Sequence, residues 1–114
     1  MEKVRVYDKL VRDNIPDIIK KNDGVPYTRI LNDEEYRREL IWKLKEECNE
    51  VEQATTKEQL IEELADVLEV LKALAKVEGK SIADVIEVAQ EKHLTRGGFE
   101  KKVYLEKVLV KEKK

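Results

Sequence analysis

The chain of 114 residues is 42% charged and 41% hydrophobic, with 23 basic and 25 acidic side chains and a formal net charge of -2. This length and composition predict one domain, residues 1–114, with no nucleic-acid surface and no apolar run of the roughly 20 residues that a membrane span needs. The charged start, Met1-Glu2-Lys3-Val4-Arg5, lacks the apolar region of a secretory signal, so we expect a cytoplasmic protein.

The first thirty residues predict short elements. Val4 and Val6 indicate a short strand, and Pro16 suits the first turn of a helix from Ile15 to about Lys21, which Gly24 would end. Residues 26–31, bounded by a glycine and an Asn-Asp pair, indicate a second strand.

Three long helical segments follow. Asn32 and the acidic residues after it are a capping signal for a helix over about 33–54. Thr55-Thr56 offers a hydroxyl cap for a second helix over about 57–78, with Gly79 as its left-handed end. A third helix begins after Ser81 and stops at Gly97-Gly98. Because the turns between them are short, we expect antiparallel packing.

The alternating pattern over residues 99–105 indicates a last strand, which with the N-terminal strands would form a small accessory β-sheet. The expected fold is therefore mainly α, an antiparallel helical bundle with a small sheet from the termini. The second long helix is apolar over more than half of its circumference, so we expect a homodimer or a dimer of dimers to complete the bundle.

The small numbers of cysteines and histidines limit the chemistry available to the chain. Cys48 is the only cysteine and His93 the only histidine, which excludes disulfide frameworks, Cys/His zinc sites and paired Glu-x-x-His di-iron sites. Carboxylates, hydroxyls, lysines and arginines remain.

A helical projection places acids on apolar faces. On the first long helix Glu47 lies about 20° from Leu40, and Glu50 lies at the edge of the stripe, with Glu46 further toward solvent. On the second, Glu63 and Asp66 share an otherwise apolar face. Clustered carboxylates need positive charge, either from lysine and arginine partners or from a divalent cation. Oxygen ligands at i and i+3 on facing helices suit Mg²⁺ or Mn²⁺ and a phosphate-bearing substrate, whereas ordinary ion pairing or solvation is the alternative.

The motif Glu46-Glu47-Cys48-Asn49-Glu50, followed by Glu63-Leu64-Ala65-Asp66, resembles the E-E-x-x-E and E-x-x-D signature of the MazG-like all-α nucleoside triphosphate pyrophosphohydrolases. The segments Tyr7 to Pro16 and Arg96-Gly97-Gly98-Phe99 resemble a branch described as predicted house-cleaning pyrophosphatases. The chain differs from phosphoribosyl-ATP pyrophosphatases, an alternative assignment, mainly at its ends.

This resemblance implies roles for specific residues. The metal ligands would be Glu47, Glu50, Glu63 and Asp66, and Glu46 would orient or deprotonate the attacking water. Lys92 and Arg96 resemble a basic pair of the family and, with Lys9 and Arg12, could hold phosphate oxygens, although surface ion pairing is the alternative. The implied reaction is Mg²⁺-dependent hydrolysis of a nucleoside triphosphate, often a noncanonical one, to a monophosphate and pyrophosphate.

Three further side chains have simpler interpretations. We expect His93 on a helix surface, Cys48 as a small buried residue, and Trp42 at a subunit contact rather than stacked on a base. The rival hypothesis to an enzyme is a non-enzymatic helical interaction module, whose acids pair with lysines across an interface.

Overall fold

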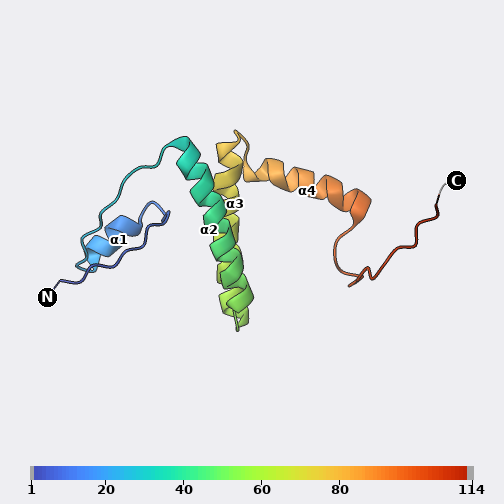
Figure 1. Cartoon of the computed structure of the whole chain (residues 1–114), viewed down its shortest axis with the longest axis horizontal. Coiled ribbons are helices and arrows are strands. Elements are labelled where there is room, and N and C mark those ends of the chain that lie inside the picture. Colours follow the sequence, from blue (N-terminus) through green and yellow to red (C-terminus); the bar gives the residue numbers. More distant parts are fainter. Residues whose placement is uncertain (1, 113–114) are drawn as a thin grey trace. The chain divides into compact units, whose positions relative to one another are not determined.

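The computed structural model describes residues 2–112. These residues form four helices in the order α1 (Ile15–Lys21), α2 (Asp33–Gln53), α3 (Lys57–Val77) and α4 (Ile82–Arg96) (Figure 1). The predicted mainly helical fold is confirmed, and the ends of α2 and α3 agree with the predicted ends to within one residue. No helix in the described part is long and apolar enough to cross a membrane.

The chain divides into two compact units, one extending to Ile82 and the other beginning at Ala83. The first unit contains α1, α2 and α3, and the second contains nearly all of α4 and the C-terminal segment. The single-domain organisation expected from the length of the chain stays a prediction.

Helices α2 and α3 form an antiparallel hairpin joined by Ala54, Thr55 and Thr56 (Figure 1). Each helix starts with a capping box. The Asn32 side chain accepts a hydrogen bond from the Glu35 backbone N–H at 2.8 Å, and the Thr56 hydroxyl accepts one from the Gln59 N–H at 3.1 Å. These caps satisfy backbone donors that a helix start leaves free, and they fix where the two helices begin.

The buried apolar side chains of the described residues belong to this hairpin, namely Leu40 of α2 and Val70 and Ala75 of α3. Cys48, which was predicted to be buried, is exposed. The physical reason is that Cys48 lies about 80° from Leu40 around α2, beyond the sector that one neighbouring helix covers. Trp42 is 57% exposed, as its projection away from the apolar stripe predicted.

Glycine ends α3 and α4 as predicted. Gly79 has a φ of 73° and donates its N–H to the Lys76 carbonyl at 3.0 Å, and Gly97 has a φ of 78° and donates to the His93 carbonyl at 2.8 Å. Positive φ is strained for residues with a Cβ atom, so glycine suits both positions.

The predicted accessory β-sheet is absent, because residues 2–112 contain no strand. In the three segments predicted as strands, Val4, Ile30 and Val103 are 89%, 96% and 83% exposed respectively. A strand needs a neighbouring strand to accept and donate its backbone hydrogen bonds, and alternation within one segment does not supply that neighbour.

Candidate metal centre

Acidic side chains from both helices of the hairpin meet near its closed end. Glu46, Glu47 and Glu50 lie in the last two turns of α2, and Glu63 and Asp66 lie within the first three turns of α3. Because the connection is short and the helices run antiparallel, these two stretches face each other. The i, i+3 spacing places both acids of α3 on one face of that helix.

Three carboxylates converge closely enough to share one ion. One oxygen each from Glu47, Glu63 and Asp66 lies within 4.8 Å of the other two, and all three residues are half-buried. Glu50, the fourth predicted ligand, is exposed and lies outside this trio, although it is near enough to act on Glu63 electrostatically. All-oxygen donors of this kind match the preference of hard cations such as Mg²⁺ and Mn²⁺.

Within the trio, the negative charge of Glu63 is the least compensated by hydrogen bonds or positive charge. Its Oε2 atom is buried and has no hydrogen-bond partner. Removal of the carboxyl group from water, followed by repulsion from Asp66, Glu47 and Glu50, raises the pKa of Glu63 above its ordinary value of 4.5. An uncompensated buried oxygen among like charges is what a cation would stabilise, so the residues present fit a divalent ion.

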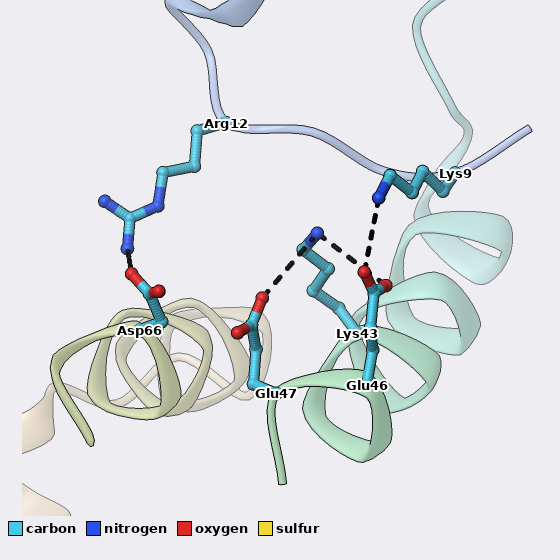
Figure 2. Close-up of polar contacts among 6 residues, drawn as sticks. All are labelled: Lys9, Arg12, Lys43, Glu46, Glu47 and Asp66. Atoms are coloured by element: carbon cyan, nitrogen blue, oxygen red, sulfur yellow. Dashed lines mark hydrogen bonds and ion pairs between the residues drawn. The ribbon is translucent and has the colours of Figure 1, made fainter. Parts of the chain in front are cut away.

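Glu46, the predicted catalytic carboxylate, is held by two lysines (Figure 2). Lys9 Nζ lies 3.2 Å from Glu46 Oε1, and Lys43 Nζ lies 3.8 Å from Glu46 Oε2. Lys43 Nζ also lies 3.7 Å from Glu47 Oε1 and so connects Glu46 with the trio.

Sequence reasoning missed Lys43, whose side chain is only 18% exposed. The signal was present, because Lys43 precedes Glu46 and Glu47 by three and four residues, the spacings at which side chains meet on one helix. Its role in the site follows from its two carboxylate contacts rather than from any motif.

The N-terminal basic residues also reach the site. Arg12 Nη2 lies 2.7 Å from Asp66 Oδ1 on α3, while Lys9 contacts Glu46 on α2 (Figure 2). Both were predicted to bind phosphate, with ion pairing as the alternative. Ion pairs with the site carboxylates are what the structure contains.

Lys92 and Arg96, the predicted basic pair, lie on α4 in the second compact unit. They are four residues apart, so they share one face of the helix, and both are exposed. Their contact with a phosphate stays a prediction. His93 is exposed, as expected for a residue on a helix surface.

The hairpin and its carboxylates define a helical protein with a group of acids that could hold a cation. Residues 11–93, more than two thirds of the chain, match the family described as phosphoribosyl-ATP pyrophosphohydrolase. The chain therefore belongs to this family, which lies in the MazG-like all-α nucleoside triphosphate pyrophosphatase superfamily. The match includes all five site acids and Arg12, and Lys9 and Arg96 fall just outside it.

A relative matches a shorter stretch. An uncharacterised protein of Mycolicibacterium smegmatis (strain ATCC 700084 / mc(2)155) is 41% identical over 54 residues, which is 47% of this chain. The match spans 55% of the length of that relative. No solved structure matches the chain significantly.

Proposed function

We propose that the chain is a Mg²⁺-dependent nucleoside triphosphate pyrophosphohydrolase that converts a noncanonical nucleotide to its monophosphate and pyrophosphate. The family gives the coarser class, a pyrophosphohydrolase. The observation that carries the metal dependence is the trio of Glu47, Glu63 and Asp66, in which the buried Glu63 oxygen has no partner. The noncanonical substrate is supported by the resemblance of the segment from Tyr7 to Pro16 to the house-cleaning branch. Mn²⁺ is an alternative ion for the same donors.

Each acid has a role in this proposal. Glu47, Glu63 and Asp66 hold the ion, and Glu50 at the edge of the trio is a fourth ligand. When bound, the ion neutralises phosphate oxygens and makes water a better nucleophile.

Glu46 lies next to Glu47 on α2 and accepts the proton of the attacking water. Lys43, through its contacts with both Glu46 and Glu47, positions the catalytic base relative to one metal ligand. The water oxygen bonds to the α-phosphorus while the bond from that phosphorus to the bridging oxygen breaks. Pyrophosphate leaves. Lys92 and Arg96, which resemble the basic pair of the family, stay candidate ligands for phosphate oxygens.

Phosphoribosyl-ATP is a second candidate substrate, favoured by the description of the matching family. The same site chemistry serves both substrates, because each reaction releases pyrophosphate. Selectivity between them depends on contacts to the base and sugar, not on the carboxylates.

The proposal is tested by assaying a panel of canonical, damaged and phosphoribosylated nucleotides with Mg²⁺ or Mn²⁺, measuring pyrophosphate and orthophosphate separately. Pyrophosphate as the primary product is expected. Orthophosphate as the primary product would place attack at the terminal phosphorus and contradict the proposal. An absence of turnover across the panel would favour the rival, a helical interaction module.

We also propose that the protein is cytoplasmic and acts as a homodimer or a dimer of dimers. The support for the oligomeric assembly is the apolar face of α3. On this face Leu64 and Leu68 are each 47% exposed and Ile61 is 59% exposed in the single chain. A second copy that packs its own helices on this face would remove it from water.

A further inference from the structure

A basic segment, residues 9–12, crosses the hairpin at the carboxylates. Lys9 contacts Glu46 on α2 at 3.2 Å, and Arg12 contacts Asp66 on α3 at 2.7 Å (Figure 2). Leu10 and Val11 between them are half-buried, whereas Val4, Val6 and Tyr7 before them are exposed. The basic segment is therefore anchored at the site, whereas the residues that precede it are not.

Arg12 and a divalent ion would both bind Asp66, because that residue belongs to the trio and also carries the arginine contact. The two cations repel each other, and neutralisation of Asp66 by an ion weakens its attraction for Arg12. The Arg12 and Asp66 side chains are 56% and 40% exposed. Solvent-exposed ion pairs contribute little stability, so Arg12 can exchange Asp66 for another partner.

Lys43 differs from the basic segment in this respect. Lys43 lies on α2 three and four residues before Glu46 and Glu47. It therefore stays beside these two carboxylates whether or not an ion or a nucleotide is bound. Residues 9–12 contain no helix or strand, and their side chains reach the site across 37 and 54 positions of sequence. The side chains of Lys9 and Arg12 can therefore change partners without disturbing α2 or α3.

We propose that Arg12 and Lys9 pair with the site carboxylates in the metal-free protein and move to the phosphates of the nucleotide once an ion is bound. This inference rests on the proposed function and extends it, because it makes the basic segment a phosphate ligand that is released by the metal. A guanidinium forms paired hydrogen bonds with phosphate as well as with carboxylate, so Arg12 suits both partners.

The proposal predicts that one substitution strengthens the binding of the metal ion and weakens the binding of pyrophosphate. In Arg12→Gln the competitor for Asp66 is gone, so Mn²⁺ should bind up to about fivefold more tightly than in the wild-type chain. At saturating Mg²⁺, the same variant should bind inorganic pyrophosphate about tenfold more weakly, because a charged donor to phosphate is lost. Electron paramagnetic resonance of free Mn²⁺ and titration calorimetry measure the two affinities.

Arg29→Gln is the matched control. Arg29 forms a similar exposed pair at 3.0 Å with Glu35, and that pair includes no site residue. Both affinities of this variant should equal those of the wild-type chain. Lys9→Gln is the second test variant, with smaller changes of the same signs as Arg12→Gln, and it serves if Arg12→Gln fails to fold.

Two outcomes overturn the proposal alone. Unchanged or weaker Mn²⁺ binding in both Arg12→Gln and Lys9→Gln would mean that the basic segment does not compete with the ion. Unchanged pyrophosphate binding would mean that it does not reach phosphate. If the wild-type chain itself binds no Mn²⁺, the proposed function fails together with this inference.

Discussion

The Glu63 carboxyl group lies among three other carboxylates, and burial together with their charge raises its pKa above the ordinary value of 4.5. In the folded chain Glu63 therefore keeps its proton at pH values where the unfolded chain has lost it. The folded state binds more protons in that range, so its metal-free stability falls as the pH rises from 4.5 through the raised pKa.

We expect Glu63→Gln to remove this loss, because a neutral amide resembles the protonated acid. In the presence of a chelator, the variant should melt at a higher temperature than the wild-type chain at neutral pH, and the difference should shrink toward pH 4.5. Thermal melting across this range measures it. A difference that is the same at every pH would show that the charge of Glu63 is not its cause.

The trio could be predicted from sequence because helical periodicity places Glu47, Glu63 and Asp66 inside apolar faces. Periodicity describes one helix at a time. It could not reveal that Arg12 contacts Asp66, since 54 residues separate them and only the folded path of the chain brings them together. It placed Glu50 at the edge of the apolar stripe, and Glu50 is exposed.

At the level of elements, side-chain hydrogen bonds in the first turn fix where α3 begins. Gln59 Oε1 accepts hydrogen bonds from the Thr55 N–H at 3.0 Å and the Thr56 N–H at 3.3 Å. The Thr56 hydroxyl in turn accepts from Gln59. This hydrogen-bond network fixes the start of α3 at Lys57. It thereby also fixes the position of Glu63 along the helix.

Thr56→Ala should therefore lower the free energy of unfolding by about 1 kcal/mol, the usual effect of removing an N-cap. Thr95→Ala is the matched control, because the Thr95 hydroxyl only donates to the Lys92 carbonyl within α4. Urea denaturation measures both variants. Equal stability of Thr56→Ala and the wild-type chain would contradict a structural role for the cap.

Capping signals also explain why the helices were predictable and the sheet was not. Asn32, Thr56 and Gly79 act on backbone groups within a few residues of themselves, so their effect can be read locally. The strand predictions around Val4, Ile30 and Val103 depended on partners elsewhere in the chain, which local alternation does not specify.

At the level of the whole molecule, the apolar face of α3 remains partly exposed in one chain. We expect light scattering at micromolar concentration to give at least twice the 13.4 kDa of one chain. Ile61→Glu should lower that mass, because a charge on this face opposes its burial between copies. Glu69→Gln, on the same helix, should leave the mass unchanged. A wild-type monomer would contradict the proposed assembly.

The central claim is that the facing carboxylates of α2 and α3 bind a divalent cation. Thermal melting with Mg²⁺, against NaCl at equal ionic strength, tests it for the wild-type chain, Glu63→Gln and the neighbouring exposed control Glu62→Gln. Ligand linkage predicts a stabilisation of about 2.7 kcal/mol at 100 times the dissociation constant. The account predicts this gain in the wild-type chain and in Glu62→Gln, with most of it lost in Glu63→Gln, whereas an equal gain in all three proteins would contradict it.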